Sequence, residues 1–156
     1  MSEFEWNAFD GKYTMTMDAP PILQVGAAFS PSPGLLIEAD IKQIWFSDVL
    51  DTVTLNTPGG AVPLRFGWDD QTVFAIGVQK RVNPKTTVRL GYNYGESPID
   101  SQDVTANFGS LAVTEHHLGM GLTRQFGRRT MGSFSYVHAF ENDVTDPSGN
   151  NTIELE

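Results

Sequence analysis

Few residues in this sequence have the types and spacing that chemistry requires. His116 and His117 are adjacent, and adjacent residues of a strand point to opposite faces, so the two imidazoles cannot share one metal ion. Asp69-Asp70 and the acidic residues near 141–146 fall in predicted loops, where carboxylates are usually solvated and occasionally hold calcium. No nucleophile elbow, phosphate loop or zinc-helix motif occurs. The sequence therefore predicts no enzyme, no cofactor and no metal site.

The composition excludes several other classes of protein. Ten Lys and Arg stand against 19 Asp and Glu, for a net charge of −9, and no basic stripe favours binding to nucleic acid. The absence of Cys excludes disulfides, Cys-ligated zinc and thiol catalysis. No apolar stretch approaches the roughly 20 residues of a membrane-spanning helix. The acidic start, Met1–Glu5, lacks the apolar region of a signal peptide, as a mature or truncated chain or a cytoplasmic protein would.

The elements that position the polar side chains are predicted strands in which apolar residues alternate with small or polar ones. Segments 73–82 and 86–95 flank a loop at 83–85, and pairing Val82 with Thr86 fixes their register. The apolar face then pairs Phe74 with Tyr94, Ile76 with Tyr92, and Val78 with Leu90. The other face pairs Ala75 with Asn93, Gly77 with Gly91, Gln79 with Arg89, and Arg81 with Thr87. A slip of one residue would mix the two faces, so the pattern selects this register.

Two further hairpins have the same construction. Segments 22–30 and 35–46 flank a Pro- and Gly-rich turn, and pairing Phe29 with Leu35 places Gly26 opposite Glu38, Gln24 opposite Asp40, and Ile22 opposite Lys42. A loop at 127–129 pairs Leu122 with Phe134, Met120 with Tyr136, and Leu118 with His138. With a strand at 12–18, about seven antiparallel strands run up and down. Tight turns alternate with long links near 47–71 and 96–113.

Alternation alone fits a soluble barrel with an apolar interior or a membrane barrel with an apolar exterior. Three features favour the membrane. The polar face is rich in glycine and other small residues, whereas a solvated face usually carries Lys, Glu and Thr. The short turns and long links match the periplasmic and outer sides of an outer-membrane barrel. Aromatic residues near the long links fit an interfacial girdle on the apolar face: Trp45, Tyr92, Tyr94, Tyr136 and Phe140.

In a membrane barrel, five charged residues fall on the face toward the lumen: Glu38, Asp40, Lys42, Arg81 and Arg89. We expect ligand binding there, because Arg and Lys pair well with a substrate carboxylate. The alternative is that these side chains pair with acidic neighbours and only order the wall. The segment 54–70 mixes apolar residues with Gly and Pro, so it forms either an external hydrophobic entry site or an ordinary surface loop.

An ordered set of segments resembles a known family. Gly67-Trp68-Asp69-Asp70 and the run FAIGVQKRVNPKTTVRLGYNYGESPI at 74–99 resemble the FadL/TodX/OmpP1 family, the outer-membrane transporters of long-chain fatty acids and aromatic hydrocarbons. Its members share a W-x-D segment, a strand with an internal glycine, a short turn, and an R-x-G-Y-x-Y strand leading to S-P. Segments 20–48, 116–127 and 134–144 fit the same pattern, so the resemblance covers roughly residues 12–144.

The resemblance implies an all-β fold, an antiparallel up-and-down transmembrane barrel of fourteen strands plugged by an N-terminal hatch. This chain lacks the hatch with its Asn-Pro-Ala segment and lacks an aromatic-ended final strand. We therefore expect residues 1–156 to be a single segment, the later half of such a barrel in the bacterial outer membrane. The implied partners are a hydrophobic small molecule such as a fatty acid, outer-membrane lipid, and other copies through open strand edges. A soluble β-barrel module for hydrophobic ligands and a purely structural outer-membrane barrel are the alternatives.

Overall fold

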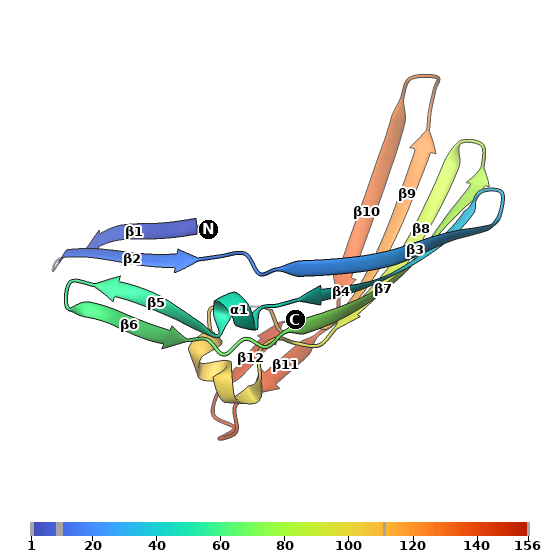
Figure 1. The fold of residues 1–156 in the computed structure, drawn as a ribbon. Coiled ribbons are helices and arrows are strands. Elements are labelled where there is room, and N and C mark those ends of the chain that lie inside the picture. Colours follow the sequence, from blue (N-terminus) through green and yellow to red (C-terminus); the bar gives the residue numbers. More distant parts are fainter. Residues whose placement is uncertain (1, 9–10, 111, 156) are drawn as a thin grey trace.

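The computed structural model describes residues 2–8, 11–110 and 112–155, and it is built almost entirely of antiparallel strands. Its largest unit is a six-stranded sheet in the order β10-β9-β8-β7-β4-β3 (Figure 1). The strands of this sheet are β3 (Ile22–Ser32), β4 (Leu35–Ile44), β7 (Gln71–Asn83), β8 (Thr86–Gly95), β9 (His116–Gln125) and β10 (Met131–Ala139). Neighbours in the sheet are joined by hairpin turns or by the long links, as the up-and-down order predicts. The all-β class is confirmed.

A second sheet extends from the long-link end of the first. It has the order β1-β2-β5-β6, with β1 (Ser2–Ala8), β2 (Gly11–Met17), β5 (Thr52–Thr57) and β6 (Gly60–Arg65). β2 leads into β3, and β6 leads into β7, so this sheet continues the strand direction beyond the six-stranded sheet (Figure 1). A short hairpin, β11 (Asn142–Thr145) with β12 (Thr152–Leu155), lies at the junction beside the 3₁₀ helix η1 (Ser101–Asn107).

All seven predicted strands are present among the described residues, and five more accompany them. The link at 47–71 is not a loop: it holds the single-turn helix α1 (Ser47–Leu50) and the hairpin β5–β6, closed by Gly60 at a φ of 127°. The prediction of a loop at 54–70 was therefore wrong. Pro58, Gly59 and Gly60 lie at the tip of the hairpin, where such residues are expected, whereas Pro63 lies within β6 and Gly67 follows it. The link at 96–113 contains η1, and the acidic segment near 141–146 contains β11.

The predicted register is correct along two hairpins. Strands β9 and β10 pair Leu122 with Phe134 and Met120 with Tyr136, as expected. Strands β7 and β8 follow the predicted ladder from Phe74 to Arg81. Their closing turn differs, because Asn83 rather than Val82 pairs with Thr86. One extra residue is accommodated by a bulge between Arg81 and Asn83, and bulges of this kind cannot be seen in an alternation pattern.

The predicted register of β3 and β4 was wrong by two residues. Phe29 lies opposite Ile37 rather than Leu35, and Gly26 lies opposite Asp40 rather than Glu38. β3 continues through Pro31 to Ser32, and an irregularity between Phe29 and Ser32 absorbs the difference. Because side chains alternate with a period of two, a shift of two residues changes partners but leaves every side chain on its predicted face.

The main buried cluster lies beneath the links, and in the described six-stranded sheet Ile44 is the one buried hydrophobic side chain. Ile99, Val104, Val113 and Ile153 form one cluster, against which Trp68 and Val144 pack. These residues come from η1, the flanking loops and the β11–β12 hairpin. No helix within the described residues is long and apolar enough to cross a membrane.

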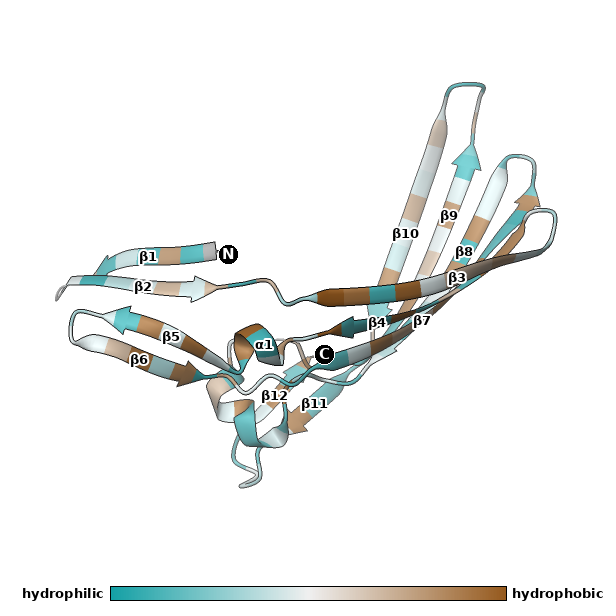
Figure 2. Cartoon of the chain, in the orientation of Figure 1, coloured by the Kyte–Doolittle hydropathy of each residue, from teal (hydrophilic) through white to brown (hydrophobic). Residues whose placement is uncertain are grey.

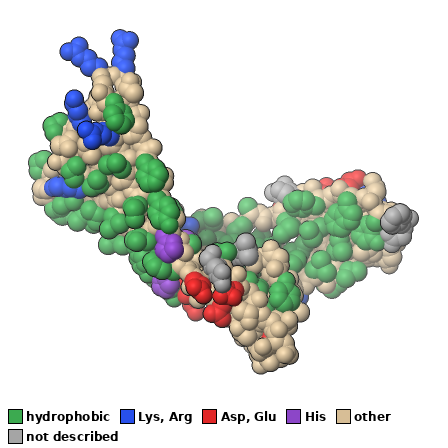
Figure 3. All heavy atoms as spheres, turned by 180° about the vertical axis from the view of Figure 1, so that it is seen from behind, with side chains coloured by type: hydrophobic (Ala, Val, Ile, Leu, Met, Phe, Trp, Pro, Cys, Tyr) green, Lys and Arg blue, Asp and Glu red, His purple; other side chains and the backbone are tan. Residues whose placement is uncertain are grey.

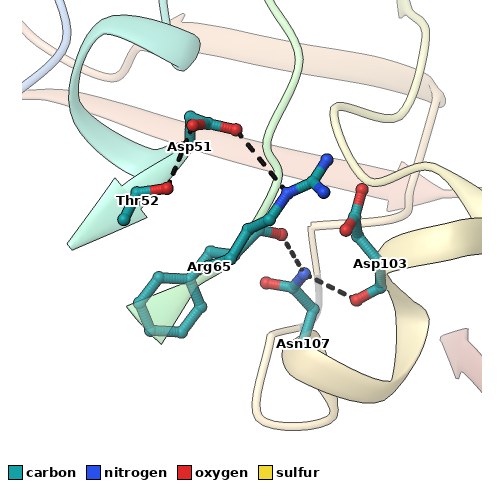
Figure 4. Close-up of polar contacts among 6 residues, drawn as sticks. Asp51, Thr52, Arg65, Asp103 and Asn107 are labelled. Carbon is teal, nitrogen blue, oxygen red and sulfur yellow. Dashed lines mark hydrogen bonds and ion pairs between the residues drawn. The ribbon is translucent and has the colours of Figure 1, made fainter. Parts of the chain in front are cut away.

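Asn107, at the end of η1, joins this helix to the chain segment at 66–68 (Figure 4). Its side-chain amide donates to the carbonyl oxygens of Phe66 at 2.6 Å and Asp103 at 2.8 Å. Its side-chain oxygen accepts a 2.7 Å hydrogen bond from the indole N–H of Trp68. Only 3% of the residue is exposed, so all of these polar groups depend on one another for partners.

Replacing Asn107 by Ala is expected to loosen this junction. The change leaves the Trp68 N–H and a backbone carbonyl without partners in a buried position, which should cost about 1–3 kcal/mol of stability. The measurement is urea-induced unfolding of the refolded protein, followed by tryptophan fluorescence. Asn150→Ala is the matched control, because Asn150 is exposed in a turn. Equal losses in the two variants would show that the Asn107 contacts do not hold the links together.

Candidate functional site

Apolar and polar residues alternate along the strands of the six-stranded sheet (Figure 2), and its apolar side chains gather on one open face (Figure 3). Phe74 is 53% exposed, Leu90 54% and Phe134 65%, although all three lie in the middle of long, regular strands. The same face carries further exposed apolar side chains on every strand: Val25, Phe29, Ile41, Ile76, Val78, Tyr92, Met120, Leu122 and Tyr136. Within the described residues, no helix or second sheet packs over them.

This apolar face determines which solvent the sheet requires. Soluble monomers rarely expose contiguous apolar patches larger than a few hundred Å². Transfer of such a surface from water to hydrocarbon is favourable by roughly 25 cal/mol for each Å². A face that spans six strands and remains uncovered is therefore stable only against lipid or another apolar surface.

The opposite face is polar and hollowed. A row of glycines crosses three strands, because Gly77 pairs with Gly91 and Gly91 pairs with Gly119. A Cβ atom added at Gly91 or Gly119 would meet nothing closer than 3.7 Å, so these glycines are not required by contacts within the chain. They instead form the floor of a groove of about 260 Å³. Side chains on either side of this row deepen the groove, Glu38 above Gly77 and Val137 beyond Gly119.

The structure places the five predicted lumen-facing charges on this polar face but does not bring them together. Glu38 and Asp40 line the glycine-floored groove, and Asp40 accepts a 3.4 Å hydrogen bond from the Gln24 amide. Lys42 lines a second groove nearer the long links. Two cations lie toward the hairpin turns, Arg81 opposite Thr87 and Arg89 opposite Gln79. Their binding role remains a prediction.

Arg89 is held in place by uncharged partners. Its Nε donates to the Gln79 side-chain oxygen at 2.8 Å, and one terminal nitrogen donates to the Thr123 hydroxyl, also at 2.8 Å. Thr123 in turn lies 3.0 Å from the Ser133 hydroxyl. The network crosses four strands from β7 to β10. It orders the guanidinium without neutralising its charge, so the positive charge remains available to an anion in the lumen.

The second groove contains two residues that the sequence analysis did not propose for ligand binding. His117 Nδ1 and Thr114 Oγ1 are buried without a hydrogen-bond partner in the described structure. Both residues line the same groove of about 260 Å³ as Lys42. Buried polar groups almost always have a partner, so two unsatisfied ones in one groove indicate a place for a polar ligand or water. Adjacent residues of a strand point to opposite faces, so His117 lies on the lumen face, beside Asn93. This alternation was the signal in the sequence that could have placed it there.

The predicted aromatic girdle follows one rim of the apolar face. Tyr92, Tyr136 and Phe140 are 40–49% exposed, and Trp45 and Tyr94 are half-buried. Tyr94 stacks on His116 with ring centroids 4.7 Å apart, and the Tyr92 hydroxyl lies 2.6 Å from His116 Nδ1. Their role at a membrane interface remains a prediction, but they lie on the expected face at the expected end.

Carboxylates gather at the junction beyond this rim (Figure 3). Partial burial raises the pKa of Asp69 above its usual value, and the nearby charges of Asp100, Asp103 and Asp70 raise it further. Asp146 differs: desolvation alone would raise the pKa of its carboxyl, but hydrogen bonds from Asn151, Ser148 and the Asn150 backbone outweigh it and lower the pKa. In the part of the chain that the structure describes, no three His, Cys, Asp or Glu side chains are grouped to hold a metal ion.

An antiparallel sheet with one exposed apolar face and one grooved polar face is typical of the wall of a membrane barrel. The class of the protein is therefore an outer-membrane β-barrel. The chain belongs to the family described as outer membrane protein transport protein (OMPP1/FadL/TodX), whose model matches residues 5–150. This membership places it in the outer membrane of Gram-negative bacteria. No curated protein sequence matches the chain.

Solved structures show the same fold. A FadL homologue from Pseudomonas aeruginosa superposes with a TM-score of 0.69 at 14% identity, covering 92% of this chain and 33% of that one. The Ralstonia pickettii toluene transporter TbuX gives 0.64 at 22% identity, covering 85% and 31%. The P. putida toluene transporter TodX gives 0.63 at 20% identity, covering 90% and 34%. The chain thus spans about a third of the length of these structures.

The orientation of the wall can be tested by placing one charge on either face of β7. Ile76→Arg puts a guanidinium against lipid and should cost about 2–4 kcal/mol near the bilayer middle, whereas Ala75→Arg on the lumen face should cost under about 1 kcal/mol. The measurement is reversible urea unfolding of the whole protein in phospholipid vesicles. A soluble barrel that buries the apolar face gives the same order of losses, so the environment separates the two: a membrane barrel folds in the vesicles and not in detergent-free buffer, whereas a soluble barrel folds in both. A larger loss for Ala75→Arg than for Ile76→Arg would overturn the assignment.

The pKa shifts at the junction predict opposite pH responses for two Asp→Asn variants. The raised pKa of Asp69 means that its ionisation destabilises the fold. The full destabilisation is present above the pKa of Asp69 in the folded protein. It is absent below the pKa of Asp in the unfolded chain, about 3.9. Asp69→Asn should therefore raise Tm at pH 7, and this gain should vanish as the pH falls toward 4.

Asp146→Asn supplies the comparison. The lowered pKa of Asp146 means that its carboxylate stabilises the fold above the unfolded pKa, and this contribution is lost as the pH falls through the folded pKa. The variant should lower Tm at pH 7 and approach the wild type in acid. Thermal melts from pH 3 to pH 7 measure both effects, and the same sign for both variants at pH 7 would contradict the assignment.

Proposed function

We propose that this chain supplies the later half of the wall of an outer-membrane channel for hydrophobic compounds. The observation that carries the proposal is the uncovered apolar face on six contiguous strands, backed by a grooved polar face. Such a wall separates lipid on one side from a solvated passage on the other. The family assignment supports transport as the role of that passage.

The two edges of the sheet support the proposal that further strands complete the barrel. β3 and β10 are the outermost strands, so each has a row of backbone N–H and C=O groups without a sheet partner inside the described chain. In hydrocarbon such groups cost several kcal/mol each when they are unsatisfied, and only closure removes the edge. The remaining strands of a longer protein would pair with β3 and β10, and a second copy of the chain is the alternative partner.

Long-chain fatty acids are the substrate class that we favour. Lys42 provides a cation in the groove where His117 and Thr114 have unsatisfied polar atoms, and a carboxylate can accept hydrogen bonds from a lysine and a hydroxyl together. Apolar side chains of Phe46, Trp68 and Val73 line the same groove and would contact an alkyl chain. The groove thus combines a polar end with an apolar wall, as an amphiphile requires.

Neutral aromatic hydrocarbons are a second candidate. Phe46 and Trp68 meet edge-to-face in this groove, with ring centroids 5.1 Å apart. An aromatic ligand in the groove can make offset-stacked or edge-to-face contacts with these rings, which are the favoured geometries of aromatic pairs. The structures of TbuX and TodX are named as toluene transporters, which also supports this candidate.

The two alternatives predict different things for the apolar face. A soluble module for hydrophobic ligands would turn this face inward around a cavity, whereas here it is exposed and the grooves lie on the polar side. A purely structural barrel would need no groove with a cation and unsatisfied polar atoms. The channel accounts for both features.

The substrate class can be tested at Lys42. In the full-length protein purified in detergent, Lys42→Met should weaken binding of a long-chain fatty acid about tenfold, because one charge-assisted hydrogen bond is lost. Toluene binding should remain within about twofold, since a neutral ligand gains nothing from the ammonium group. Isothermal titration measures both affinities.

Lys12→Met is the matched control, because Lys12 is an exposed cation on β2 that pairs with Glu5 at 2.9 Å, away from the groove. It should leave both affinities unchanged. Unaltered fatty-acid binding in the Lys42 variant would show that the fatty-acid carboxylate does not bind in this groove. Equal losses for the fatty acid and toluene would instead indicate a change in groove shape.

A further inference from the structure

Positive charge is concentrated at the turn end of the six-stranded sheet (Figure 3). Segments 79–89 and 122–133 hold seven of the ten Lys and Arg residues and no Asp or Glu. These segments form the tips of the β7–β8 and β9–β10 hairpins. The long-link end has the opposite character, because its carboxylates outnumber its cations. Such a separation of positive and negative charge between the two ends of the sheet requires an explanation other than solubility.

The cations of these tips divide between the two faces of the sheet. Lys80 lies between Leu35 and Val88, and Arg124 lies opposite Thr86, on the face that carries Val78, Leu90 and Leu122. They are therefore on the lipid side: Lys80 is in the row of Val88, Leu122 and Phe134, and Arg124 is one row nearer the turns. Arg81 and Arg89 lie on the lumen side. Lys80 and Arg124, together with Lys85, Arg128 and Arg129 of the turns, are called the cationic rim below.

The cationic rim has no anionic partner in the described parts of the chain. The cations of two ion pairs, Lys12 with Glu5 and Arg65 with Asp51, lie in the four-stranded sheet and not in the cationic rim. A lysine or arginine on the lipid face cannot leave its charge in hydrocarbon, so its long side chain extends to the level of the headgroups. The nearest anions at that level are the phosphates of membrane lipids.

We propose that the cationic rim binds the headgroups of anionic glycerophospholipids in the periplasmic leaflet. Short turns face the periplasm in outer-membrane barrels, and this places the rim at that leaflet. Polybasic surfaces attract anionic lipids within a Debye length, and each added cation strengthens the attraction. The aromatic girdle at the opposite end has His116, Tyr94 and Tyr92 in place of Lys and Arg. The preference for anionic lipids is therefore expected in one leaflet only.

The test compares the lipid selectivity of two double variants. Each loses two positive charges, one variant from the lipid face and the other from the lumen face. The full-length protein is reconstituted in phosphatidylcholine vesicles containing spin-labelled phosphatidylglycerol or spin-labelled phosphatidylcholine. The motionally restricted lipid is then measured by electron paramagnetic resonance. The wild type should favour phosphatidylglycerol by about threefold or more. Lys80→Gln/Arg124→Gln should lose most of this preference, and Arg81→Gln/Arg89→Gln should keep it.

Either of two results would overturn the proposal: no preference in the wild type, or equal loss in the two double variants, which would indicate net charge alone. A rim variant that does not refold, as judged by heat-modifiable gel mobility, is replaced by Arg128→Gln/Arg129→Gln. That change lies outside the strands and should also lower the preference. Fatty-acid affinity should stay at the wild-type value in all rim variants, so failure of this proposal is separable from failure of the proposed transport function.

Discussion

Hydrogen bonds between neighbouring strands are the constraint on which the rest of this structure depends. In hydrocarbon the backbone has no water to bind, so each long strand needs a partner on both sides. Continuous antiparallel ladders from β10 to β3 meet this need for the four inner strands, and they fix the side chains on two alternating faces. One face can then be largely apolar because nothing in the chain must cover it. The other is free to carry glycines, charges and grooves.

Much of the wall could be predicted because strand faces depend on parity alone. The pairing of Phe74 with Tyr94 and of Leu122 with Phe134 followed from keeping apolar residues together. The same reasoning failed for β3 and β4, where a register two residues away satisfies parity equally well. Only the irregularity beyond Phe29 separates the two registers, and it depends on how Pro31 is accommodated in the strand. The hairpin at 52–65 was missed for a related reason, because Pro and Gly at its tip dominate a short segment.

The site was harder to predict than the wall. Which charges face the lumen follows from parity, and the positions of Glu38, Asp40 and Lys42 on the polar face agree with it. Which of them share a groove depends on the links, whose path is set by contacts far apart in the sequence. Trp68 reaches the groove through its contact with Asn107, and Thr114 reaches it through the loop that precedes β9. His117 shows the limit most clearly, since its face was predictable and its unsatisfied nitrogen was not.

Different interactions stabilise the junction at the long-link end and the six-stranded wall. At the long-link end, Ile99, Val104 and Val113 form a small buried core of the kind found in soluble proteins, and Asn107 joins its segments. In the wall, the apolar side chains remain uncovered and gain their free energy from lipid. The junction can therefore keep its shape in water while the wall is stable only in a membrane. Because the groove of Lys42 and His117 lies where these two regions meet, its walls combine a water-stable layer with a lipid-dependent one. Its geometry is then fixed only when both are folded, so under the proposed function a ligand would bind to the assembled barrel and not to either part alone.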